Sequence, residues 1–115
     1  MATFTCEMPE LCSWLEAVIS ATTELTDDDL RRALHGVFQK LGPRARVIAL
    51  PPDFTRFNSR AGLLTCATHD YYGDRLTDVM PALGTHFPMP DWQLEKMFPG
   101  VPKSLVREHR WRDDV

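Results

Sequence analysis

Residues 47–56 read VIALPPDFTR, an apolar run that passes through two prolines to an acid, a hydroxyl and a guanidinium. A short apolar run that is bounded by prolines is typical of a buried strand, because proline cannot continue the ladder of hydrogen bonds. A second motif, DVMPALGTH at 78–86, has the same layout and ends in Gly-Thr-His. We therefore predict strands at 44–50 and 75–83, each with polar residues at its carboxyl end.

Helical patterns lie before, between and after these strands. The expected helices cover 11–21, 26–41, 58–72 and 90–98, and a last short strand falls within 101–111. The helix at 26–41 has the clearest start, because Thr26 can cap it and Asp29 follows three residues later. Strand and helix alternate after residue 43, which implies parallel β-α-β units. The predicted fold class is α/β, a small parallel-sheet Rossmann-like fragment preceded by two helices.

The length and composition of the chain indicate one domain. With 115 residues, the chain is long enough for one core and too short for two ordinary domains. We predict a single domain over 1–115, with a helical segment at 1–43 and an α/β portion at 44–115. The net charge is −3, and no basic block stands out. Because nucleic-acid binding requires neutralisation of phosphates, we expect no nucleic-acid partner.

Several features predict a cytoplasmic protein without a membrane partner. No apolar run approaches the ~20 residues of a membrane span, and the N-terminus lacks the pattern of a signal peptide. Cys6, Cys12 and Cys66 are an odd number without a CxxC pair, which fits reduced thiols. Small parallel sheets normally need both faces covered, so exposed apolar surface could also allow self-association.

The polar residues after the two strands predict one binding site, because ligands of open α/β sheets bind at the carboxyl ends of parallel strands. Arg56 could hold a carboxylate or phosphate through two parallel hydrogen bonds. Asp53 could orient that guanidinium or bind a hydroxyl of the ligand. His86 is a natural group for proton transfer near neutral pH, and Gly84 would let a ligand approach the backbone. Together these residues would form an anion clamp and a base.

The same residues also have plainer interpretations. Asp53 and Thr55 could belong to a polar loop that caps the next helix, with Arg56 paired to Asp53 on the surface. His86 could be a structural hydrogen-bond donor at the end of a strand. The histidines lack the spacing of a shared metal site, so we predict no metal ligands in this chain.

Three stretches resemble a known family. They are DFTR at 53–56, ALGTHFPMPDWQLEKMF at 82–98 and VREHRW at 106–111. Their order and spacing resemble the N-terminal part of the lactate racemase family that uses a nickel-pincer nucleotide. Members of that family show an acid-x-Thr-Arg motif, then Gly-Thr-His with an acid-rich helix behind it, and then a strand that contains a His. The resemblance covers about residues 44–115.

The resemblance implies an isomerase that racemises or epimerises a small 2-hydroxy acid at C2. In the family, the cofactor accepts the hydride from C2 while a His removes the hydroxyl proton, which gives a transient 2-keto acid. By position, His86 matches a proton-transfer His and Arg56 matches the contact to the substrate carboxylate. The neighbouring pocket would include Asp53, Thr55, Gly84 and Thr85.

The chain also departs from the family pattern. Phe87 stands where Arg is common and Pro90 where Thr is common, so the resemblance implies no particular hydroxy acid. The second proton-transfer His, the Lys that attaches the cofactor and the nickel-binding His would follow Val115. We therefore expect the N-terminal portion of a longer racemase, with no cofactor bound to this chain alone. The alternative is a non-enzymatic α/β module that binds a small anion or a protein.

Overall fold

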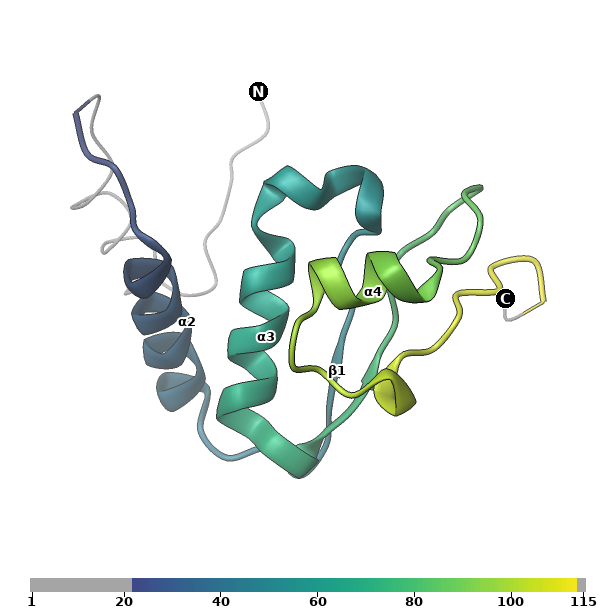
Figure 1. Cartoon of the computed structure of the whole chain (residues 1–115). Coiled ribbons are helices and arrows are strands. Elements are labelled where there is room, and N and C mark those ends of the chain that lie inside the picture. The colour runs from purple at the N-terminus through teal and green to yellow at the C-terminus, as the bar shows by residue number, and fades with distance from the viewer. Residues whose placement is uncertain (1–21, 114–115) are drawn as a thin grey trace, which may run out of the picture.

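The computed structural model describes residues 22–113 (Figure 1). The helix predicted at 11–21 lies outside the described residues, as do Cys6 and Cys12. In chain order the elements are α2 (Asp27–Leu41), β1 (Val47–Ala49), the 3-10 helix η1 (Phe54–Ser59), α3 (Ala61–Tyr72), the 3-10 helix η2 (Gly73–Arg75), β2 (Leu76–Val79), α4 (Asp91–Met97) and the 3-10 helix η3 (Lys103–Leu105). These elements form a small α/β fold, which agrees with the α/β part of the prediction.

Helix α2 begins as the sequence predicts. The Thr26 hydroxyl accepts a hydrogen bond from the Asp29 backbone at 3.2 Å, and the Asp29 carboxylate accepts one from the Thr26 backbone at 2.9 Å. This reciprocal capping box satisfies backbone donors that have no partner within the helix. An ion pair between Asp27 and Arg60 then links the start of α2 to the start of α3.

The two strands pair in parallel, with Val47 opposite Leu76 and Ala49 opposite Val79. Both strands are shorter than predicted, because β1 begins only at Val47 and prolines interrupt the regular ladder soon after Ala49 and Val79. The two segments nevertheless stay together, because Pro52 and Ala82 form an isolated parallel bridge. The segments that follow β1 and β2 therefore leave the sheet next to each other.

The prediction of a strand within 101–111 is wrong. This part of the chain forms η3 and then a single parallel bridge between Val106 and Val79, where the Arg107 backbone donates to the Val79 carbonyl at 2.8 Å. The 3-10 turn occupies residues that a strand would need, so only a short piece of chain runs beside β2. The described sheet therefore has two strands, with one further segment touching its edge.

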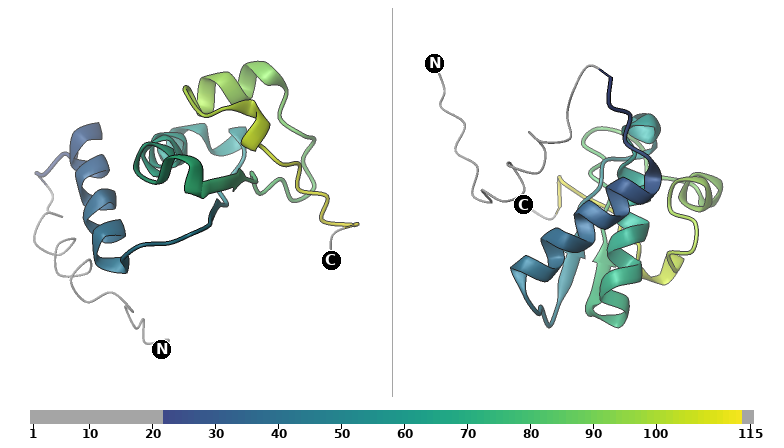
Figure 2. Two further views of the ribbon diagram at one scale, coloured as in Figure 1. Left: turned by 90° about the horizontal axis from the view of Figure 1, so that it is seen from below. Right: turned by 90° about the vertical axis from the view of Figure 1, so that its left-hand side faces the viewer.

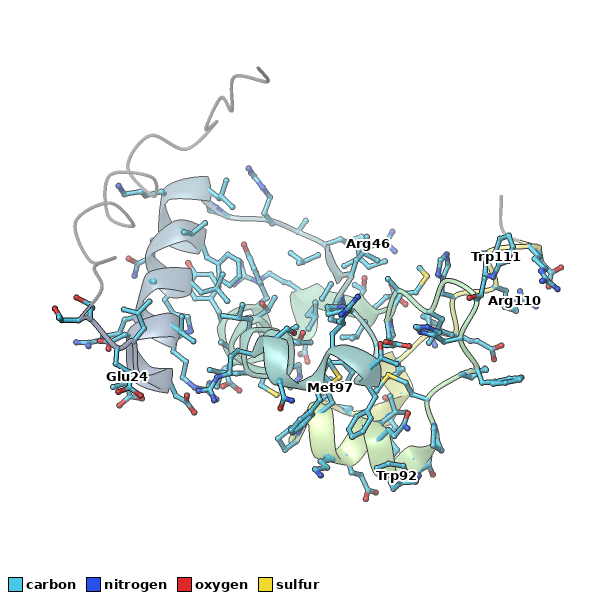
Figure 3. All side chains as sticks on the ribbon, turned by 90° about the horizontal axis from the view of Figure 1, so that it is seen from above. Glu24, Arg46, Trp92, Met97, Arg110 and Trp111 are labelled. Atoms are coloured by element: carbon cyan, nitrogen blue, oxygen red, sulfur yellow. The ribbon has the colours of Figure 1, made fainter. Side chains whose placement is uncertain are left out.

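Helix α3 is the centre of the packing. It lies between α2 and α4, as Figures 1 and 2 show from different sides. The core cluster consists of Cys66, Tyr72, Leu76, Val79, Met97, Phe98 and Val101. Met97 lies where α4 meets α3, whereas Trp92 is at the periphery of α4 (Figure 3). Cys66 is a free thiol in this core, and burial raises its pKa.

One face of β1 packs against the core and the other is exposed. Val47 and Ala49 contact the core cluster, whereas Ile48 and Leu50 are 48% and 65% exposed. This alternation follows from the two-residue period of a strand. Among the described helices, none is long and apolar enough to cross a membrane.

Two glycines give a matched test of this packing. A Cβ on Gly62 of α3 would lie 2.1 Å from the Met97 carbonyl oxygen, whereas a Cβ on Gly36 of α2 would meet nothing within 4 Å. We expect Gly62→Ala to destabilise the protein by roughly 1–3 kcal/mol or more, because α3 and α4 would have to separate. Gly36→Ala should instead stabilise it by about 0.5–1 kcal/mol, as alanine favours a helix interior. Urea unfolding followed by circular dichroism measures both, and an unaffected Gly62→Ala would contradict this packing.

Candidate functional site

The two sequence motifs meet at the carboxyl end of the sheet. The bridge between Pro52 and Ala82 places the following residues of both segments side by side. Asp53 then begins η1 as its N-cap residue. On the other segment, Gly84 has a positive φ of 58°, and the turn closes where the His86 backbone donates to the Leu83 carbonyl at 3.0 Å. Glycine suits that left-handed conformation, so this turn directs His86 back toward the first motif.

Asp53 and His86 are in direct contact. The Asp53 Oδ2 atom lies 2.6 Å from the His86 Nδ1 atom, although the two residues are 33 positions apart in sequence. The Asp53 side chain is only 6% exposed, whereas that of His86 is 54% exposed. The second carboxylate oxygen accepts hydrogen bonds from the Thr55 backbone at 3.2 Å and from the Thr55 hydroxyl. Asp53 therefore caps η1 and holds the imidazole at the same time.

The electrostatics favour an ionised Asp53. Burial by itself raises the pKa of Asp53, but the hydrogen bonds from Thr55 and then from His86 outweigh it and keep this pKa below its usual range. An ionised carboxylate can only accept hydrogen bonds, so Nδ1 of His86 carries the proton of this contact. A neutral imidazole held in this way presents Nε2 as an acceptor, which is the arrangement of a general base.

Arg56 does not pair with Asp53. Its backbone donates to the Asp53 carbonyl at 3.0 Å, but its side chain is exposed and forms no ion pair within residues 22–113. The surface pair considered from the sequence is therefore not formed, and His86 takes the carboxylate instead. The guanidinium stays available to an anion. Thr85 and Gly84 are exposed on the turn before His86.

The described residues contain no cluster of potential metal ligands. Across residues 22–113, no three His, Cys, Asp or Glu side chains come close enough to hold a metal ion. Asp53 and His86 make only a pair, and His69 lies on α3 rather than in the motifs. The contact between Asp53 and His86 is suited to proton transfer, and the exposed guanidinium of Arg56 is suited to anion binding.

Comparisons with protein-family models, curated proteins and solved structures give no match. The resemblance to the lactate racemase family thus stays a prediction.

Sequence reasoning placed Asp53, Thr55, Arg56, Gly84, Thr85 and His86 at one site. It missed that Asp53 binds His86 rather than Arg56. A signal was available, because the carboxyl ends of two neighbouring parallel strands lie together, and an acid after one strand can meet a histidine after the other. Which of the two basic side chains reaches Asp53 depends on the turn at Gly84.

The pKa of Asp53 predicts a specific dependence of stability on pH. Because the folded state lowers this pKa below the unfolded value of about 3.9, the stabilisation is fully present above that value and is lost as pH falls through the folded pKa. We expect Asp53→Asn to cost about 1–3 kcal/mol at neutral pH, and this difference from wild type to shrink below about pH 4. Urea unfolding from about pH 2.5 to 7 measures it.

Thr55→Ser is the matched control, because it keeps the hydroxyl and should keep the dependence on pH. A difference between wild type and Asp53→Asn that is constant over this range would show that the carboxylate charge of Asp53 does not stabilise the fold.

Proposed function

We propose that this chain supplies the proton-transfer and carboxylate-binding part of an active site for a small 2-hydroxy acid. In this proposal it is the N-terminal, Rossmann-like portion of a cytoplasmic 2-hydroxyacid racemase or epimerase. The observation that carries the proposal is the buried Asp53 carboxylate on Nδ1 of the half-exposed His86. A structural histidine needs no such exposure, whereas a general base must reach its substrate.

The proposed proton step uses the two ends of the imidazole. Nε2 of His86 accepts the proton from the substrate hydroxyl, and the imidazolium that forms is stabilised by the Asp53 charge at Nδ1. Thr55 keeps Asp53 ionised and in place through its own hydrogen bonds. Asp53 is thus already oriented before the substrate arrives, so no reorganisation is needed during the transfer.

Arg56 has the complementary task in this proposal. A 2-hydroxy acid carries its carboxylate next to the carbon that bears the hydroxyl. The exposed guanidinium follows Asp53 by three residues and has no carboxylate partner in the described chain. A two-point contact to the substrate carboxylate would therefore orient the hydroxyl toward His86. The hydride step at C2 needs the cofactor of the family, and the proposal assigns no described residue to it.

Arg56 provides a direct test of binding. We expect both Arg56→Lys and Arg56→Ala to weaken the binding of lactate to this chain by roughly 10- to 100-fold, because lysine keeps the charge but loses the planar fork. Titration of the ¹⁵N-labelled chain with lactate, followed by NMR, measures the dissociation constants. The melting temperature should not change, since the side chain is exposed.

Arg44→Ala is the matched control for this test, because Arg44 is exposed and precedes β1 at the other end of the strand. Unaltered lactate binding by Arg56→Ala would show that Arg56 does not contact lactate. Wild-type binding by Arg56→Lys would show that Arg56 contributes its charge alone, without a two-point contact from the planar guanidinium.

His86 provides the test of chemistry. In a racemase that contains this chain, His86→Ala should lower kcat by ~10²–10⁴-fold, the range for loss of a positioned acid-base group, with a smaller effect on KM. Chiral chromatography of lactate measures the turnover. Normal turnover in His86→Ala would return His86 to a structural role and would leave the anion-binding module as the function of this chain.

A further inference from the structure

An exposed cluster of aromatic side chains joins η1 to α4. The ring centroid of Phe54 lies 5.3 Å from that of Phe57 and 5.2 Å from that of Trp92. Phe54 packs against the core, whereas Phe57 and Trp92 are 38% and 57% exposed. The ammonium group of Lys96 lies 6.0 Å and 5.3 Å from the centroids of Phe54 and Phe57. These four side chains form one surface, which we call the aromatic patch.

The aromatic patch carries a positive charge that has no acidic partner nearby. Lys96 forms no ion pair within the described part of the chain. The two acids of α4, Asp91 and Glu95, are both engaged by Lys103, at 3.3 Å and 2.8 Å. Exposed aromatic rings are enriched where proteins bind partners, and complementary charge selects among those partners. The patch therefore fits a partner that is both apolar and acidic.

The chain itself contains a segment of this chemistry. Residues 1–30 contain no lysine or arginine. The helix that the sequence predicts at 11–21 has one apolar face at the spacing of an amphipathic helix. This face consists of Leu11, Trp14, Leu15, Val18 and Ile19. At 3.6 residues per turn, Glu16 borders this face, and Glu7 and Glu10 precede the helix. The segment is thus apolar on one side and acidic overall.

The connection to α2 brings this segment within reach of the aromatic patch. Asp27 at the start of α2 is paired with Arg60, which directly follows η1. Phe57 is three residues before Arg60, so their Cα atoms are at most about 11 Å apart. Residues 22–26 can span about 17 Å when extended, which exceeds that separation. The segment can therefore fold back onto the patch without a change in the described fold.

The exposed face of β1 is the other apolar surface that such a segment could cover, since Ile48 and Leu50 lie on it. Figure 3 shows Glu24 and Trp92 toward one side of the molecule and Arg46, which directly precedes β1, toward the opposite side. The chain thus enters α2 on the side that carries Trp92. This placement favours the aromatic patch over the exposed face of β1.

We propose that residues 11–21 form an amphipathic helix that binds the aromatic patch of the same chain. The apolar face of this helix covers the rings of Phe57 and Trp92, and its acidic charge is attracted to Lys96. Burial of these rings removes apolar surface from water. The short connection to α2 gives the segment a high effective concentration, so a weak contact is sufficient. This inference goes beyond the proposed function and does not rest on it.

The experiment detects the contact directly on the whole 115-residue chain. In ¹³C,¹⁵N-labelled protein, nuclear Overhauser effects report protons that lie close together. We expect these effects between the ring protons of Phe57 or Trp92 and the methyl groups of residues 11–21. Effects from these methyl groups to Ile48 or Leu50 instead, or to neither surface, would overturn the proposal.

A mixture of labelled and unlabelled chains separates contacts within one chain from contacts between copies. We expect the effects within one chain. Effects that appear only between labelled and unlabelled chains would show that a second copy covers the aromatic patch, and the proposal would be overturned.

Two variants of the segment test its apolar face. Leu15→Asp places a charge within that face and should abolish the contacts with the aromatic patch. Ser13→Asp is the matched control, because it adds the same charge on the opposite face of the predicted helix and should keep the contacts. Contacts that survive in Leu15→Asp would show that the apolar face does not bind the patch.

Two variants of the described surface test the role of charge. Lys96→Glu should weaken the contacts about two- to fivefold, because it replaces an attraction between exposed charges by a repulsion. Arg44→Glu makes the same reversal at an exposed residue before β1 and should leave the contacts unchanged. Equal effects of the two substitutions would contradict the assignment to the aromatic patch.

Discussion

The parallel pairing of β1 with β2 is the constraint on which the site depends. Backbone hydrogen bonds continue past the regular strands, from Met80 to Ala49 at 2.9 Å and from Ala82 to Pro51 at 2.8 Å. Parallel strands end at the same edge of a sheet, so two motifs from distant parts of the chain emerge together. Without this pairing, Asp53 and His86 would have no reason to meet. A slip in register would separate them, because every side chain would shift to another position.

Burial of the Asp53 carboxylate is unfavourable by itself, and its hydrogen bonds with Thr55 and His86 offset this cost. An unpaired carboxylate in a buried position would be strongly destabilising. Thr55 and His86 compensate for this burial, and the ionised carboxylate then holds the imidazole in one orientation. The contacts that stabilise the loop are also the ones that orient His86 in the proposed proton transfer. Stability and function are coupled here, since removal of the carboxylate should affect both.

The packing of α3 and α4 explains why η1, which begins after Asp53, is held close to the rest of the fold. Helix α3 covers one face of the sheet, and its Gly62 allows the backbone of α4 to come near. The rings of Phe54 in η1 and Trp92 in α4 meet edge to face, with centroids 5.2 Å apart, and this contact connects the first motif to the helix that follows the second. The opposite face of β1 exposes Ile48 and Leu50, where parallel sheets are normally covered. The described part of the chain thus buries the face of β1 that packs on the core and leaves the other face exposed.

The sequence alone determined the α/β class, the start of α2 at Thr26, and the six residues that gather at the ends of the strands. These features follow from local rules of capping, periodicity and proline placement, which act over a few neighbouring residues. Tertiary structure decided that the chain around Val106 forms only a bridge, and that Asp53 binds His86 and not Arg56. Both outcomes depend on distances between segments far apart in sequence. A local pattern cannot specify such distances, because they result from how the helices pack on the sheet and how the turn at Gly84 directs the chain.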